Sequence, residues 1–168
     1  MSSHLPSLLG VDPGIGITGY GVLFVSGHSV QVAEAGVIKT KVRTDLAFRL
    51  VELRSGIEEI LDQYRPYAVA IEQLFAHYKH PRTAIIMGHA RGVILEAIAR
   101  RGTEVHSISP RQAKKTITGS GNAGKSQMQQ AMMVELGLTS TPDPPDVADA
   151  LALALCLHHR MLGTGDLP

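Results

Sequence analysis

The sequence is poor in the residues that mark several special classes of protein. Its 168 residues contain one cysteine, Cys156, no tryptophan and only 4% aromatic residues. A single cysteine cannot form an internal disulfide, so we expect a protein of the reducing cytoplasm. No apolar run approaches the ~18 residues that a membrane span needs. The first residues also lack the basic start of a signal peptide, and Asp12 interrupts the apolar run that follows.

Net charge is also scarce, at only +1 over the whole chain. Its distribution is uneven, however. Residues 73–126 contain nine lysines or arginines and two acidic residues, which leaves that segment at +7 and the remainder at −6. A basic middle between acidic ends is typical of an anion-binding face beside an acidic pocket, although scattered solvated side chains would give the same count.

The order of hydrophobic patterns predicts one α/β domain over residues 1–168, with flexible tails at residues 1–6 and 162–168. Apolar runs bounded by turn residues predict strands at 7–11, 19–25, 30–38, 67–71 and 104–108. Helical periodicity and helix-forming composition predict helices at 46–64, 82–100, 110–115, 126–136 and from residue 146 onward. Short connections between the first three strands favour antiparallel pairing, so we expect a mixed five-stranded sheet flanked by helices.

Four carboxylates stand at the ends of these predicted elements. Asp12 and Glu72 each end an apolar strand, where sites form in open α/β sheets. Asp146 and Asp149 lie three residues apart at the start of an alanine- and leucine-rich helix, so both point to the same side. Each has an ordinary explanation alone, for example Asp146 as a helix cap and Asp12 as a turn residue. Together they indicate a site for Mg²⁺, or for Mn²⁺, because both cations suit oxygen ligands.

Five short motifs follow one another in the sequence. They are GVDPG at residues 10–14, TGYG at 18–21, IEQ at 71–73, GHARG at 88–92 and DVADA at 146–150. In this order they resemble the RuvC family of Holliday-junction resolvases, the crossover junction endodeoxyribonucleases. The resemblance implies a ribonuclease H-like fold, a homodimer, and Mg²⁺-dependent nicking of two opposed strands at a four-way DNA junction in recombination and repair. Carried over by position, it makes Asp12, Glu72, Asp146 and Asp149 the catalytic, metal-binding carboxylates, with two ions in the site. It also implies a branch-migration complex of the Ruv type as a partner.

Candidate DNA contacts come from the same resemblance and from the basic segment. Lys114 and Lys125 match basic residues of the family, and Phe75 matches its aromatic residue after the glutamate. An exposed aromatic ring can stack on an unpaired base, worth ~1–3 kcal/mol, although Phe75 alone would also fit as a loop anchor in the core. Lys125 would in addition stabilise charge at the scissile phosphate, as a catalytic residue. The further candidate phosphate contacts are Arg82, Arg111 and Lys115.

Two other functions compete with junction cutting. The first is a nucleotide-binding domain, since GSGNAGKS at residues 119–126 satisfies the phosphate-binding loop of nucleotide hydrolases. The nearest predicted strand ends at Ile108, however, and not directly before that loop. Asp12-Pro13-Gly14 also resembles the phosphate loop of actin-like ATPases and sugar kinases, which need two lobes around the nucleotide. The second is a module that binds junctions without cutting, which the complete carboxylate set argues against.

Two features near the middle of the chain bear on assembly and on metals. Gly88 and Gly92 lie four residues apart in a predicted helix, where each glycine costs stability. We therefore expect close packing against another element, and we take residues 88–99 as the candidate dimer interface, because a symmetric junction has two equivalent strands to cut. His77 and His80 lie in a polar loop and lack convincing metal-ligand spacing.

Overall fold

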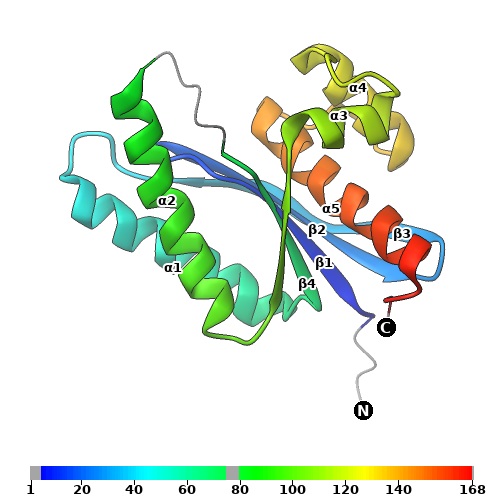
Figure 1. Ribbon diagram of the computed structural model, residues 1–168, viewed down its shortest axis with the longest axis horizontal. Coiled ribbons are helices and arrows are strands. Elements are labelled where there is room, and N and C mark those ends of the chain that lie inside the picture. The colour runs from blue at the N-terminus through cyan, green and yellow to red at the C-terminus, as the bar shows by residue number, and fades with distance from the viewer. Residues whose placement is uncertain (1–4, 75–79, 168) are drawn as a thin grey trace.

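The computed structural model describes residues 5–74 and 80–167 of the chain. A five-stranded sheet lies between two layers of helices (Figure 1). The strands are β1 (Ser7–Asp12), β2 (Ile17–Ser26), β3 (Ser29–Lys39), β4 (Ala68–Glu72) and β5 (Glu104–Ile108). The helices are α1 (Leu46–Tyr64), α2 (Pro81–Ala99), α3 (Pro110–Thr118), α4 (Lys125–Glu135) and α5 (Pro145–Thr164). Every strand and helix predicted from the sequence is therefore present, with ends that differ by a few residues.

The sheet has the strand order β3-β2-β1-β4-β5. β1, β2 and β3 form antiparallel pairs through short connections, whereas β4 lies parallel to β1 and β5 lies parallel to β4. This is the mixed sheet of a ribonuclease H-like fold, and it confirms the predicted fold class. Because β1, β4 and β5 are parallel, their carboxyl ends meet at one edge of the sheet.

Alternating side chains divide the core into two halves, one on each face of the sheet. Leu9 and Val69 pack with the buried residues of α1 and α2, while Leu8 and Ala68 pack with those of α5. This is the period of two expected of buried strands. In Figure 1, α1 and α2 cover one face and α5 crosses the other, with α3 and α4 beside the start of α5.

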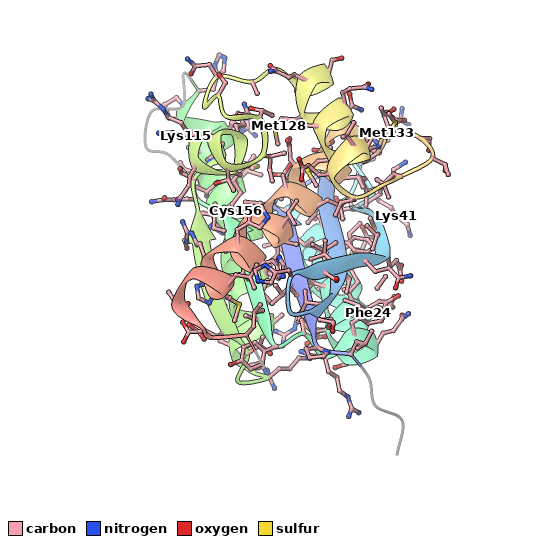
Figure 2. All side chains as sticks on the ribbon, turned by 90° about the vertical axis from the view of Figure 1, so that its right-hand side faces the viewer. Phe24, Lys41, Lys115, Met128, Met133 and Cys156 are labelled. Atoms are coloured by element: carbon pink, nitrogen blue, oxygen red, sulfur yellow. The ribbon has the colours of Figure 1, made fainter. Side chains whose placement is uncertain are left out.

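α5 is the most deeply buried helix of the structure, with twelve buried residues that include Cys156. Figure 2 shows Cys156 on the part of α5 that crosses the sheet. The helix starts at Pro145, and its N-cap is Pro144, so Asp146 lies in the first turn and does not cap the helix. The helix continues to Thr164, into the stretch predicted as a tail. It ends there because Gly165 adopts the left-handed conformation and donates its N–H to the Met161 carbonyl. None of the helices in the described residues is long and apolar enough to cross a membrane.

The expectation about Gly88 and Gly92 is wrong within this chain. Both lie on the exposed side of α2, and a Cβ atom added to either would meet no atom of the described residues within 4 Å. A helical glycine reveals a cost in stability, but it does not reveal what balances that cost. Neither glycine is therefore required by packing against the rest of the described chain.

Candidate active site

Asp12 and Glu72 lie side by side because β1 and β4 are neighbours. Val11 is opposite Ile71 in the parallel pair, and each carboxylate is the next residue of its strand. Both strands end there, so the two side chains emerge together at the carboxyl edge of the sheet. This is the position that the strand ends predicted for them.

Close contact between α5 and the sheet brings the other two carboxylates to the same edge. Gly19 is opposite Asp12 in the β1–β2 pair, and the backbone of Asp146 lies directly against it. One turn further along the helix, Gly10 lies against the backbone of Ala150 and Ala154. Neither glycine has room for a Cβ atom, so the missing side chains allow α5 to lie on the sheet with Asp146 and Asp149 near Asp12.

The turn that follows Asp12 is held by a buried hydroxyl. Thr18 Oγ1 accepts the Gly14 N–H at 3.1 Å and donates to the Gly14 carbonyl at 2.6 Å. Thr18 is fully buried and Gly14 is half-buried, so both bonds are partly shielded from water. The reciprocal pair fixes the start of β2 against the turn and thereby fixes where Asp12 leaves the sheet. From the sequence alone, Thr18 has no predicted role, although it lies within the TGYG motif.

Burial and mutual repulsion raise the pKa values of three of the four carboxyls. The pKa of Asp12 rises to about 8, first because the group is buried and then because Glu72, Asp149 and Asp146 lie near it. The pKa of Glu72 rises to about 7 through burial and the charges of Asp149 and Asp146. Burial is also the main cause of the raised pKa of Asp149. Such a cluster binds either protons or cations, because ionised carboxylates at this spacing repel one another.

Two lysines approach the cluster from α3 and α4. The positive charge of Lys114 lowers the pKa values of Glu72 and Asp149 and so offsets part of their rise. The charge of Lys125 has the same effect on Asp12 and Asp149. The carboxylates Asp12, Glu72 and Asp149 line a hollow of about 190 Å³, together with Lys114 and the buried side chain of Met128. Figure 2 shows Met128 between α3 and α4. Three acidic residues and Lys114 therefore share one small depression at the edge of the sheet.

The other predicted DNA contacts have different positions. Arg111 and Lys115 line a separate open hollow on α3 with Thr116, and Figure 2 shows Lys115 at the outer side of that helix. Arg82 is exposed in the first turn of α2. Phe75 and His77 lie outside the described residues. His80 caps α2 through its backbone and is exposed.

The donor set fits a hard divalent cation by its chemistry. It consists of carboxylate oxygens only, which are the ligands that Mg²⁺ and Mn²⁺ prefer. Burial, and then the nearness of the other acids, raises the pKa of Asp12 and of Glu72, and a cation would relieve the repulsion between the ionised groups. In the orientations that the side chains have here, no three His, Cys, Asp or Glu residues in the described part of the chain converge tightly enough to hold a single ion.

The loop at residues 119–126 is not a nucleotide site of the phosphate-binding-loop type. Helix α3 comes directly before it, and Gly119 is the C-cap of that helix, whereas the motif requires a strand there. Lys125 begins α4, and Gly124 is the N-cap of that helix. Gly121 packs against the side chain of Arg111, so the loop supports the basic surface of α3.

One residue of the GHARG motif, Arg91, contacts the backbone of a site residue with its side chain. Arg91 on α2 donates from Nε to the carbonyl oxygen of Glu72 at 3.0 Å and from Nη2 to Ser107 Oγ at 2.8 Å. From the sequence alone, Arg91 belongs to the basic segment and to the GHARG motif, with no predicted role of its own. Its place in a quoted motif, one helical turn from Gly88, was the available signal.

A ribonuclease H-like sheet with clustered carboxylates at its edge defines a class of nucleases. Comparison with known proteins then narrows the class. Residues 8–158 match the family described as crossover junction endodeoxyribonuclease RuvC. The chain belongs to that family, whose members are metal-dependent nucleases.

Individual relatives agree with this assignment over most of their length. The crossover junction endodeoxyribonuclease RuvC of Rhodopirellula baltica is 47% identical over 90% of this chain and 85% of that protein. The RuvC of Heliobacterium modesticaldum is 44% identical over 92% of this chain and 94% of that protein. Among solved structures, RuvC of T. thermophilus in complex with a Holliday junction substrate matches with a TM-score of 0.86 at 33% identity, covering 95% of this chain and 97% of that one.

Proposed function

We propose that this protein resolves four-way DNA junctions by hydrolysing phosphodiester bonds, with paired nicks in two opposed strands. The observation that carries the proposal is the cluster of Asp12, Glu72 and Asp149 beside Lys114 in one hollow, in a chain of the RuvC family. Its relative from T. thermophilus was solved with a Holliday junction bound, which supports the same substrate here.

The four carboxylates would hold the divalent cations. We assign this role to Asp12, Glu72, Asp146 and Asp149, with two Mg²⁺ ions per site that Mn²⁺ can replace. Bound there, such ions supply an activated water and stabilise the leaving oxygen of an in-line cleavage. The chain itself contributes a buried cluster of acids, and a bound cation would relieve the repulsion between their ionised forms.

The basic residues bind and position the DNA in this proposal. Lys125 and Lys114 meet phosphate oxygens next to the carboxylates, and Lys125 stabilises charge at the scissile group. Arg111, Lys115 and Arg82 contact phosphates further from the cut. Phe75 stacks on an unpaired base of the DNA.

The functional unit in this proposal is a homodimer with its two sites on equivalent strands. The exposed side of α2 supports this, because it presents Ile85, at 64% exposure, and the two glycines without a neighbour in the described chain. A partner helix could approach closely there. A branch-migration complex of the Ruv type as a partner, and a cytoplasmic location, belong to the same proposal.

The experiment is a nicking assay on a synthetic four-way junction and a matched linear duplex, with and without Mg²⁺ and with and without ATP. We expect paired nicks in the junction that require the metal and ignore ATP. Cutting that depends on ATP would favour a nucleotide-binding domain. Junction binding with no cutting in either Mg²⁺ or Mn²⁺ would favour the non-cutting module.

A further inference from the structure

Arg91 joins helix α2 to the ends of two neighbouring strands. Its guanidinium donates to the Glu72 carbonyl, on the last residue of β4, and to the hydroxyl of Ser107 on β5. Ser107 is opposite Ile71 in the parallel pair, so the two acceptors lie on adjacent strands at nearly the same level. The side chain therefore bridges the carboxyl edge of the sheet directly behind the carboxylate of Glu72.

The Glu72 carbonyl needs such a donor because regular pairing ends at this residue. The pairing with β1 ends at Ile71, whereas the next N–H on the other side, that of Gln73, still donates to the Ile108 carbonyl at 2.9 Å. Arginine suits this task, because its planar fork holds several donors in fixed directions and can bind two acceptors at once. Lysine has the charge without the fork.

The charge of Arg91 is not used in an ion pair within the described residues. No carboxylate in residues 5–74 and 80–167 lies within 4.0 Å of its nitrogens, and both of its acceptors are neutral groups. Arg101 on the same chain differs, because it pairs with Asp62 and Glu58. Arg91 is thus held by hydrogen-bond geometry at a strand end.

We propose that Arg91 is a positioning residue that fixes the backbone of Glu72, so that its carboxylate is presented to the metal site at the correct place. The inference rests on the function proposed above. Metal ligands depend on the groups that orient them, and the loss of such a partner typically costs ~10–100-fold in metal affinity or activity. Helix α2, which contains the candidate dimer interface, would in this way also support the active site.

The test compares Arg91→Gln, Arg91→Lys and Ser107→Ala with Arg100→Gln. Arg100 is an exposed arginine at the far end of α2, in a surface pair with Glu96. Three quantities are measured for each variant: the Mn²⁺ concentration for half-maximal nicking, the rise in Tm on adding MnCl₂ to chelated protein, and junction affinity in EDTA.

We expect Arg91→Gln to raise the Mn²⁺ requirement ~10–100-fold and to reduce the Mn²⁺-induced rise in Tm, while junction affinity in EDTA stays unchanged. Ser107→Ala removes one of the two bonds and should have a smaller effect in the same direction. Arg91→Lys should fail to restore the metal requirement, and Arg100→Gln should behave as the wild type.

Several results would overturn the proposal. A wild-type metal requirement in Arg91→Gln would do so. Full activity of Arg91→Lys would also do so, because it would show that positive charge alone, without the guanidinium fork, is enough at this position. Lost junction affinity in EDTA would make Arg91 a DNA contact. If Arg91→Gln does not fold, Ser107→Ala decides in the same way. A wild-type protein that gains stability from Mn²⁺ but cuts no junction would instead refute the proposed function and leave this inference standing on the Tm measurement.

Discussion

A Cβ atom on Gly19 would overlap the backbone of Asp146, with only 2.6 Å to its carbonyl carbon. The first turn of α5 thus depends on the absence of a side chain on β2. Gly19→Ala should push α5 away from the sheet, lowering the free energy of unfolding by about 1–3 kcal/mol. A displacement of ~1 Å would lower the nicking rate ~10²-fold. Denaturant melts and nicking rates measure the two effects.

Gly163→Ala is the matched control for that substitution. Gly163 lies on α5, the helix whose first turn contacts Gly19. A Cβ atom added to Gly163 would meet no atom of the described chain within 4 Å. Since alanine is the better helix former, we expect equal or greater stability and unchanged nicking. A Gly19→Ala protein that matched this control in both measurements would show that the sheet and α5 can separate without consequence.

Replacing any one of Asp12, Glu72, Asp146 or Asp149 by its amide should abolish nicking and preserve junction binding. Affinity for DNA comes mainly from lysine and arginine on phosphates, and removal of an acid reduces repulsion. Nicking and binding are measured on the same synthetic junction. Asp149→Asn is the most informative, because its stability in chelator should equal or exceed the wild type. An Asp149→Asn protein that melted much earlier in chelator would have a structural aspartate there instead.

Stability without metal should fall as the pH rises. The pKa of Asp12 increases from 3.8 in its ordinary state to about 8 in the folded chain. Between these values the folded chain holds more protons than the unfolded chain, so unfolding becomes easier with rising pH. Melting curves in EDTA from about pH 5 to about pH 9 should show this trend. Mg²⁺ should flatten it, and so should Asp12→Asn; an equal slope in Asp12→Asn would assign the effect to other groups.

Lys125→Ala should slow cutting in saturating DNA by ~10²-fold. The reason is that Lys125 lies close enough to Asp12 and Asp149 for its charge to lower the pKa of both carboxyls. Lys115→Ala should weaken junction binding with little change in that rate, since Lys115 lies in the separate hollow on α3. Single-turnover rates at two junction concentrations distinguish the two effects. ATP should matter in neither variant. Wild-type hydrolysis of ATP that disappears in Lys125→Ala would return the loop at residues 119–126 to a nucleotide site.

The wild type should sediment as a dimer at micromolar concentration, and Ile85→Glu should sediment as a monomer. Ile85 is exposed on α2, and a charge there would be desolvated in an interface. Val134→Glu, at an equally exposed position on α4, serves as the control and should stay dimeric. A monomeric wild type with undiminished paired nicking would rule out the dimer.

Sequence patterns predicted the strands and the helices because each follows from local periodicity and turn residues. They also predicted that Asp12 and Glu72 end strands, while their adjacency depends on the β1–β4 pairing that only the structure gives. Two relationships were beyond local patterns. The contact of Gly19 with Asp146 joins residues far apart in the chain, as does the bond from Arg91 to Glu72. Asp146 was considered as a helix cap because the sequence could not show that Pro144 takes that place. The roles of the four carboxylates stay predictions.

The position of α5 at the end of the fold has a consequence for synthesis of the protein. By the time Glu72 has been made, half of the acidic cluster exists, but Asp146 and Asp149 arrive only with the last helix. Until that helix docks, Leu8 and Leu23 have no cover on their face of the sheet. A nascent chain on the ribosome would therefore carry an incomplete acidic cluster. The ability to cut DNA would arise in one step, when the final helix docks.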